Sequence, residues 1–326
     1  MSNAYTGVGT AGDVVGIPAN ILTVHTNDLI LAAMPVMRYD QFAVVRTDLT
    51  KNPGDTISFQ KYANLARGGA LAEDVDLEPK SMSKTAVPIS VTEYGNAVGL
   101  TQKFLSLSFM DEMQNASMLL GRDYALVTDT MLRDALFSGS QTYLANNVAN
   151  TGVLASTDTL DLDDLDAVIE VLATGNALKL VDANGEYYGS YFHPHHAKPI
   201  KKLLISVRQY AYPELIFKGE VGEYNGIRFI ETTNCPNGAA ANTDVSYDAT
   251  LVQGYDPAGG VTANLCDLYK LVVFGQNAYG WAVALPVELR EDPGFSKFGR
   301  KRGLAWYSIM GAAKIIDESI VVIITA

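Results

Sequence analysis

The segment from Gly54 to Leu100 reads GDTISFQKYANLARGGALAEDVDLEPKSMSKTAVPISVTEYGNAVGL. Apolar and polar residues alternate at its start, at Ile57 and Phe59, and again near its end, at Val87 and Ile89. Such a period of two is typical of β-strands. The residues between are rich in glycine and charge and contain few large apolar side chains. The segment therefore predicts a long two-stranded excursion.

We expect this excursion to need another surface to lie on. An isolated hairpin is only marginally stable in water, so it cannot bury a core of its own. A long helical pattern follows it, starting at about Thr101 or Ser108 and ending at Phe137. A long β-excursion that leads into a long helix is more typical of an assembling protein than of an enzyme.

The helical pattern has an eleven-residue repeat, with steps of four, four and three residues. This corresponds to about 3.67 residues per turn, so the apolar stripe stays on one side of a nearly straight helix. Ser108 and Asp111 resemble a capping box, which predicts a short helix that breaks and restarts there. The stripe consists of Leu105, Phe109, Met113, Ala116, Leu120, Tyr124, Val127, Met131 and Ala135.

The composition is that of an ordinary globular protein. The chain has 326 residues, 48% hydrophobic and 18% charged, which is enough for one large or two ordinary domains. The net charge of −12 argues against a free-standing nucleic-acid-binding protein, which would present a basic face. The sequence shows neither a signal peptide nor an apolar run that could span a bilayer. We therefore expect a soluble protein.

Two groups of residues suggest catalytic or metal chemistry at first sight. His193, His195 and His196 fall within four residues, but they lack helical spacing and a nearby carboxylate or cysteine partner, so a strand-to-helix junction is favoured over a metal site. Cys235 and Cys266 have no CxxC partner, and we interpret them as ordinary small side chains.

Two clusters of carboxylates also have simpler explanations. Glu73, Asp74, Asp76 and Glu78 lack the glycine turn of a calcium loop and are interpreted as a charged edge that resists wrong pairing. A helix from Leu160 to Ala173, capped by Thr159, would begin with four acidic residues that complement its dipole; these are Asp161, Asp163, Asp164 and Asp166. We predict no catalytic, cofactor-binding or metal-ligating residue, and no cofactor.

The remaining elements follow from periodicity and turn signals. The asparagine and glycine at 225 and 226 give the strongest short turn signal in the chain. The further predictions are helices at Ile21–Met34 and Ala197–Val207, a hairpin at Gly219–Thr233, strands at Phe42–Val45, Tyr187–Phe192, Ala249–Gln253, Leu268–Phe274 and Gly280–Leu285, and strands within Gly303–Ala326.

The order of these parts resembles the major capsid proteins of tailed double-stranded DNA bacteriophages, which have the HK97-like fold. Short stretches match as well, and they resemble the podophage N4-type major capsid family. These stretches are GDTISF at 54–59, EYGNAVGLT at 93–101, YFHP at 191–194, the G-x-R-F-I hairpin at 226–230, VFGQNAYGW at 273–281 and KFGRKRGLAWY at 297–307. The resemblance covers nearly the whole chain.

The resemblance implies an α+β fold with an N-terminal arm, an extended β-hairpin loop, a long spine helix, a peripheral domain and an axial α/β domain. It divides the chain into an arm at 1–30, a segment leading into the peripheral domain at 31–50, the extended β-loop at 51–101, the spine helix and peripheral domain at 102–158, the axial domain at 159–285 and a return to the peripheral domain at 286–326.

The resemblance also implies a function. The chain would be a structural protein, not an enzyme, whose copies form hexamers and pentamers in an icosahedral shell around phage DNA. Implied partners are a portal, a separate scaffolding protein, a decoration protein and packaged DNA that is bound without sequence specificity, with no membrane. The protein would belong to the virion and assemble in the host bacterial cytoplasm.

Two alternative functions remain open at this point. The first is an encapsulin-type compartment shell, which has the same fold in a cellular role. The second is a metal-dependent hydrolase that uses His193, His195 and His196.

Overall fold

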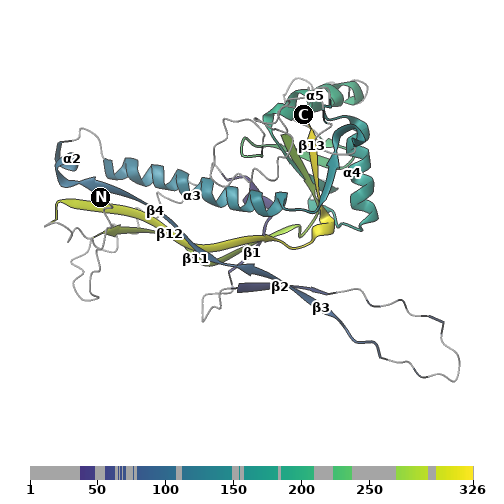
Figure 1. The fold of residues 1–326 in the computed structure, drawn as a ribbon, viewed down its shortest axis with the longest axis horizontal. Coiled ribbons are helices and arrows are strands. Elements are labelled where there is room, and N and C mark those ends of the chain that lie inside the picture. Colours follow the sequence, from purple (N-terminus) through teal and green to yellow (C-terminus); the bar gives the residue numbers. More distant parts are fainter. Residues whose placement is uncertain are drawn as a thin grey trace, which may run out of the picture.

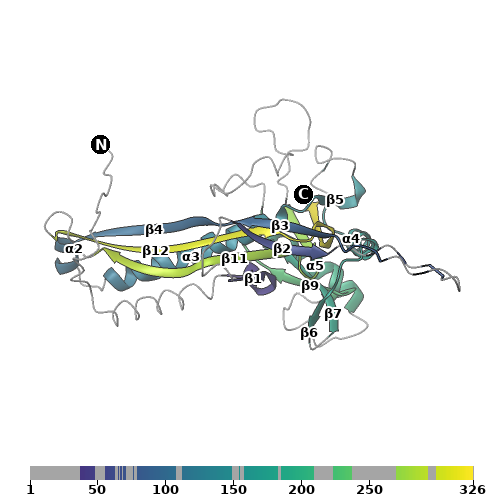
Figure 2. The ribbon, with the colours of Figure 1, turned by 90° about the horizontal axis from the view of Figure 1, so that it is seen from below.

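The computed structural model describes residues 37–47, 56–62, 65, 67, 69–70, 76, 79–107, 112–148, 154, 158–182, 185–208, 223–236, 269–292 and 299–325. These residues form sheets of four, seven and two strands. In Figure 1 the four-stranded sheet and a long helix make an elongated slab, the seven-stranded sheet stands at one end of it, and a hairpin projects beneath. Figure 2 shows the elongation of the slab from below.

The slab is a four-stranded sheet with one long helix, α3 (Glu112–Phe137), along it. The 26 residues of α3 correspond to a length of about 39 Å. The two longest strands of the four-stranded sheet, β11 and β12, pair antiparallel and have 14 residues each. The strand order is β1 (Val44–Arg46), β11 (Tyr279–Asp292), β12 (Lys301–Lys314) and β4 (Thr92–Thr101).

The predicted apolar stripe of α3 faces this sheet. Ala116, Leu120 and Tyr124 are buried in one cluster with Trp306 of β12. The rings of Tyr124 and Trp306 meet edge to face, 5.4 Å apart. A separate short helix, α2 (Gln102–Leu107), precedes α3, so the predicted pair of helices is confirmed, while the capping box predicted at Ser108 and Asp111 lies outside the described residues. The eleven-residue period therefore located both the helix and its buried side.

The seven-stranded sheet is buried on both faces. Its two central strands consist mostly of buried apolar residues, as expected where both faces are covered. One face packs against the last turns of α3 through Leu132 and Leu136, and the other packs against α4 (Leu162–Thr174) and α5 (Pro194–Arg208). The order is β5 (Gln141–Leu144), β13 (Ile320–Thr325), β10 (Tyr269–Phe274), β7 (Gly185–Phe192), β9 (Ile227–Glu231) and β8 (Glu223–Tyr224), with β6 (Leu180–Asp182) paired to β7.

The hairpin consists of β2 (Thr56–Tyr62) and β3 (Lys84–Ser90). The strands pair antiparallel in one unbroken register, from Thr56 opposite Ser90 to Tyr62 opposite Lys84. The two-stranded excursion predicted from the alternation is therefore confirmed. The described part of the chain also contains three 3₁₀ turns, η1 (Tyr39–Phe42), η3 (Ala145–Asn147) and η7 (Asp317–Ser319).

The sheets group some strands differently from the ranges predicted from the sequence. β4 lies within the predicted loop range 51–101, yet it pairs with β12 in the slab. β5 and β13 come from the ranges 102–158 and 286–326, yet they pair with each other in the seven-stranded sheet. Periodicity locates a strand but does not choose its distant partner, because pairing depends on cross-strand packing. The placement of the ranges in a shell stays a prediction.

The N-cap of α4 was predicted wrongly. Asp161, not Thr159, caps the helix: its carboxylate accepts from the Leu162 N–H at 2.7 Å, and the Asp164 carboxylate accepts from the Asp161 N–H at 3.1 Å. This is a capping box built from two acidic residues. The predicted favourable placement of carboxylates at this helix start is confirmed.

Two strand predictions also need correction. The stretch predicted as a strand at Phe42–Val45 is the end of η1 followed by β1, because Asp129 holds the backbone of η1. The strand predicted at Gly280–Leu285 continues to Asp292, because its charged residues alternate with buried Leu289 opposite β12. The helix predicted at Ile21–Met34 and the strand predicted at Ala249–Gln253 lie outside the described residues.

Candidate interaction surfaces

The base of the hairpin is seated on the slab of its own chain. Ile57, Phe59 and Ile89 are buried in a small cluster with Ala282 of β11. A Cβ added at Gly280 would lie 3.0 Å from the Phe59 ring and 3.2 Å from Ile89 Cδ1, so the absence of a side chain there makes room for the cluster. The base of the excursion therefore lies on another surface, as expected, and that surface belongs to its own chain.

A second glycine brings backbone against backbone at this seat. A Cβ at Gly311 of β12 would lie 2.2 Å from the carbonyl oxygen of Ser90, at the end of β3. No side chain fits at that distance, which is a common reason for glycine where two backbones approach closely. Gly280 and Gly311 together fix how the hairpin leaves the slab.

Beyond its base, the hairpin exposes large apolar side chains. Tyr62 and Leu65 are each 57% exposed, and Met82 is 71% exposed. One ion pair restrains the side of the hairpin: Lys61 Nζ lies 3.0 Å from Glu318 Oε2 of η7. An exposed ion pair of this kind contributes about 0–1 kcal/mol, so it adds little to the stability of the hairpin's position on the slab. Of the four carboxylates predicted as a charged edge, only Asp76 is described, and it is exposed.

The far end of the slab has a second apolar surface. Met118, Leu119 and Leu126 lie on the side of α3 that faces away from the sheet, and all three are about half exposed or more. Phe104 and Leu107 of α2 are exposed as well. Large apolar side chains gathered on an exposed helix face usually mark a contact with another protein surface.

A buried carboxylate holds the start of the described chain onto α3. Asp129 Oδ1 accepts from the backbone N–H groups of Arg38 at 2.7 Å and Tyr39 at 3.0 Å. Its other oxygen accepts from Asn234 Nδ2 at 2.9 Å, and the Asn234 carbonyl oxygen of the side chain accepts from Arg133 at 2.7 Å. We call this hydrogen-bonded group of Arg38, Tyr39, Asp129, Arg133 and Asn234 the clasp. No sequence motif marks it, because Asp129 lies 90 residues from Tyr39 and 105 residues from Asn234.

The three histidines form an aromatic cluster around Tyr269. The His195 ring stacks on Tyr269 at 3.9 Å, and the His193 ring lies 5.3 Å from it. His196 is buried, and its Nε2 lies 2.7 Å from the Thr325 hydroxyl. Burial, followed by the neighbouring histidines, lowers the pKa of His196 to about 3, so this ring is neutral at physiological pH. Among the described residues, no three His, Cys, Asp or Glu side chains are grouped so that they could hold a metal ion.

Cys235 is completely buried, and its Sγ lies 3.2 Å from the hydroxyl oxygen of Tyr39. Burial raises the pKa of this thiol to about 12, which keeps it protonated and therefore a poor nucleophile. The interpretation of Cys235 as an ordinary small side chain stays a prediction, and Cys266 lies outside the described residues. None of the helices in the described ranges is both long and apolar enough to cross a membrane.

Comparison with known proteins points to one family. A family model described as "Phage capsid protein" matches residues 84–314. Among solved structures, the cyanophage Pam1 capsid has a TM-score of 0.68 at 16% identity, covering 90% of this chain and 92% of that chain. The Ralstonia phage GP4 capsid gives 0.66 at 15% identity, covering 89% and 91%. The capsid of a native GTA particle gives 0.58 at 13% identity, covering 98% and 94%.

No curated protein sequence matches the chain. The structural likeness spans nearly the whole of each compared chain at low identity, so it shows a shared fold. The α+β capsid fold predicted from the order of the parts is confirmed.

Proposed function

The chain belongs to the phage capsid protein family, and from this membership we propose how its copies join into a shell. It is a major capsid protein with the HK97-like fold, and copies of it build the shell of a tailed bacteriophage, as the sequence predicted. The observation that carries this conclusion is the family match over residues 84–314, which runs from the start of β3 to the end of β12.

In the proposed shell, the hairpin beyond its seat lies across a neighbouring copy. The exposed Tyr62, Leu65 and Met82 support this proposal, because a second copy would cover apolar area that this chain leaves in water. The outer face of α3, with Leu119 and Leu126, is proposed as another contact with a neighbouring copy. The arm predicted at residues 1–30, proposed to contact a further neighbour, lies outside the described residues.

The seven-stranded unit takes the axial position at the centre of hexamers and pentamers, and the slab takes the peripheral position. The ranges of these units follow the sheets: β4 belongs with the slab, and β5 and β13 belong with the axial unit. The protein acts without catalysis, as a structural part of the virion that assembles in the host bacterial cytoplasm. Proposed partners are a portal, a separate scaffolding protein, a decoration protein and the packaged DNA. The DNA is enclosed without sequence-specific binding, in agreement with the negative net charge of the chain.

Electron microscopy and sizing of the purified protein test the proposal. We expect megadalton shells from the wild-type chain, and a variant shortened between Leu71 and Lys84 that stays folded by circular dichroism but no longer forms regular shells. A wild-type protein that remains monomeric under all assembly conditions contradicts the proposed assembly. A shortened variant with unchanged shells contradicts the role of the hairpin.

The two alternative functions are separated by simple observations. A neighbouring gene for a cargo enzyme, in place of phage genes, would favour the encapsulin-type compartment, whereas the family match favours the phage shell. Metal analysis tests the hydrolase: stoichiometric zinc or iron would support it. The stacking of His195 on Tyr269 and the burial of His196 favour a structural role for these rings.

A further inference from the structure

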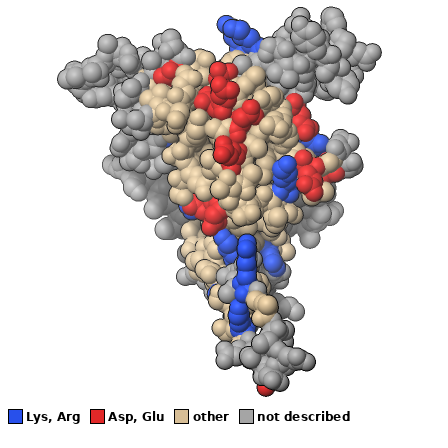
Figure 3. All heavy atoms as spheres, turned by 90° about the vertical axis from the view of Figure 1, so that its right-hand side faces the viewer, with Lys and Arg blue, Asp and Glu red and all other residues tan. Residues whose placement is uncertain are grey.

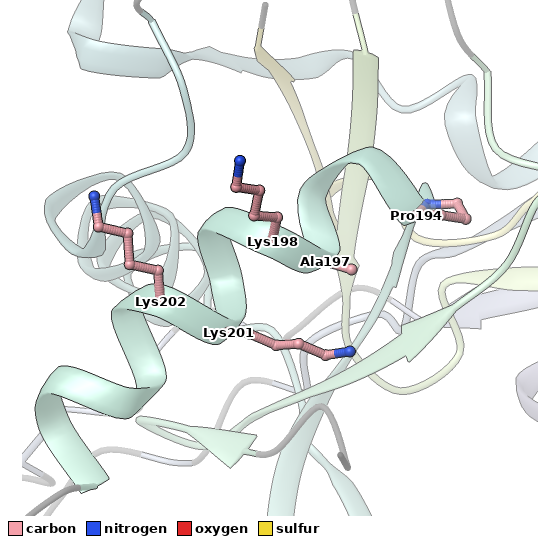
Figure 4. Close-up of a pocket in the computed structure, with 5 residues that line it drawn as sticks. All are labelled: Pro194, Ala197, Lys198, Lys201 and Lys202. Atoms are coloured by element: carbon pink, nitrogen blue, oxygen red, sulfur yellow. The ribbon is translucent and has the colours of Figure 1, made fainter. Parts of the chain in front are cut away.

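Helix α5 carries a basic surface on an otherwise acidic protein. Its sequence, PHHAKPIKKLLISVR, contains no acidic residue, although the chain as a whole has a net charge of −12. Lys198, Lys201 and Lys202 are exposed and, with Pro194 and Ala197, line a shallow hollow of about 510 Å³. Figure 4 shows the three lysine side chains extending from the helix around this hollow. Within the described ranges, none of the three forms an ion pair.

Helix α4 carries the opposite charge. Its sequence, LDDLDAVIEVLAT, contains no basic residue. Asp163, Asp166 and Glu170 are exposed at i, i+3 and i+7, which places them on one side of the helix. The face of the molecule on which α4 lies shows several acidic side chains (Figure 3).

Capping does not account for this acidic surface. Asp161 and Asp164 form the capping box, and Asp166 accepts from Tyr224 and Asn225. Glu170 lies beyond the first two turns, where the dipole at the helix start no longer favours a carboxylate. Val171 beside it is 40% exposed. The surface therefore combines unexplained negative charge with a small apolar contact.

The two helices match in spacing but do not neutralise each other within one copy. Both pack on the same face of the seven-stranded sheet, and in Figure 1 α5 lies across its end while α4 lies along its side. At 1.5 Å per residue, Lys198 and Lys202 are about 6 Å apart along the axis, and so are Asp166 and Glu170. No ion pair joins α4 to α5 among the described residues.

We propose that the basic surface of α5 binds the acidic surface of α4 on the next copy of this chain in the capsomer. Two different, complementary surfaces on one subunit can join copies head to tail, and such a contact forms a ring when the rotation between copies closes. Two α5 surfaces would repel each other, as would two α4 surfaces, so the charges disfavour a dimer in which like helices face each other. Pro194 and Ala197 would meet the side of α4 near Val171. The inference rests on the proposed shell function.

A reciprocal charge swap tests the contact. One variant carries Lys198→Glu and Lys202→Glu, the second carries Asp166→Lys and Glu170→Lys, and the third carries all four changes and so keeps the wild-type net charge. We expect each double variant to lower the shell yield at least about tenfold at about 0.1 M salt. The fourfold variant should restore the yield, because attractive pairs form again. The variant Lys198→Arg with Lys202→Arg is the matched control and should assemble like the wild type.

The outcomes separate this contact from the proposed function. If the wild type forms no shells, the proposed function fails. If the wild type forms shells and either double variant does so equally well, the contact between α4 and α5 is refuted. The contact is also refuted if the fourfold variant does not recover the wild-type shell yield. It is refuted as well if the variant with Lys198→Glu and Lys202→Glu forms normal shells that contain less DNA, which would assign the basic surface to nucleic acid. Unfolding midpoints of the subunits check that each double variant still folds, and Glu170→Lys alone is the substitute if Asp166→Lys, which loses the bonds from Tyr224 and Asn225, unfolds α4.

Discussion

Replacing Gly311 with alanine should disturb the hairpin without unfolding the subunit. The added Cβ would stand 2.2 Å from the Ser90 carbonyl oxygen, 3.1 Å from its carbonyl carbon and 3.3 Å from Val91 Cα. All three neighbours are backbone atoms, so no side chain can rotate away. Ordinary contact begins at 3.4 Å, and β3 must therefore move away from β12 by roughly 1 Å.

The size of the effect follows from this geometry. Overpacking of this kind costs about 1–3 kcal/mol, and the rigid backbone on both sides favours the upper end of that range. A 1 Å opening across Ser90 and Val91, about 7 Å of strand, tilts β3 by roughly 8° and moves its far end, about 20 Å away, by roughly 3 Å. That displacement is comparable to a side-chain contact, so a hairpin docked on a neighbour would lose its fit.

Chemical unfolding of the isolated subunit and electron microscopy of assembled material measure the two effects. We expect Gly311→Ala to lower the unfolding free energy by about 2–3 kcal/mol and to reduce regular shells far more than that loss of stability alone would. Gly99→Ala in β4 is the matched control, because a Cβ there meets nothing within 4 Å. If Gly311→Ala behaves like Gly99→Ala in both measurements, the close approach at the seat has no energetic weight and the reasoning fails.

Three further predictions use the same unfolding measurement. Asp129→Asn should cost about 2 kcal/mol, because its new amide would face the Asn234 amide that it now accepts from; a loss below 0.5 kcal/mol, roughly the uncertainty of the method, would contradict the clasp. Trp306→Phe keeps an aromatic ring but removes part of the buried indole and its 2.8 Å hydrogen bond from Nε1 to Asp123, and should cost about 2–3 kcal/mol; an unchanged midpoint would contradict the packing of this ring against α3. The folded-state pKa of His196 is about 3, below its usual 6.5, so the unfolded chain binds the proton first as the pH falls. Its contribution to stability is complete above pH 6.5 and is lost as the pH falls towards 3, so His196→Gln should flatten the acid limb of the stability curve, and an unchanged acid limb would refute its role.

The interaction surfaces could be predicted only in part. The alternation at Ile57 and Phe59 located the hairpin, but it could not show that these side chains are buried on the slab of the same chain, because the small cavity that receives them is made by Gly280. The histidines illustrate the same limit. Their spacing argued against a helical metal motif, but it could not show that the ring on which His195 stacks belongs to Tyr269, in a distant strand.

The sequence by itself determined the local elements. The period of α3, the alternation of β2 and β3, the acidic start of α4 and the turn at Asn225 and Gly226 are all present in the structure, because each depends on residues within a few positions of one another. Their order was sufficient to indicate the capsid family.

Tertiary structure alone decided which of these elements meet. It paired β4 with β12 and placed β13 beside β10, it joined Asp129 to Tyr39 across 90 residues, and it set Lys61 against Glu318 across 257. These choices depend on complementary shape, close backbone approach and the satisfaction of buried polar groups, which emerge only when distant segments share the same space. A local sequence pattern does not specify the distant segment that it packs against. The contacts of the hairpin base with the slab, and those of Asp129, could therefore be identified only in the folded chain.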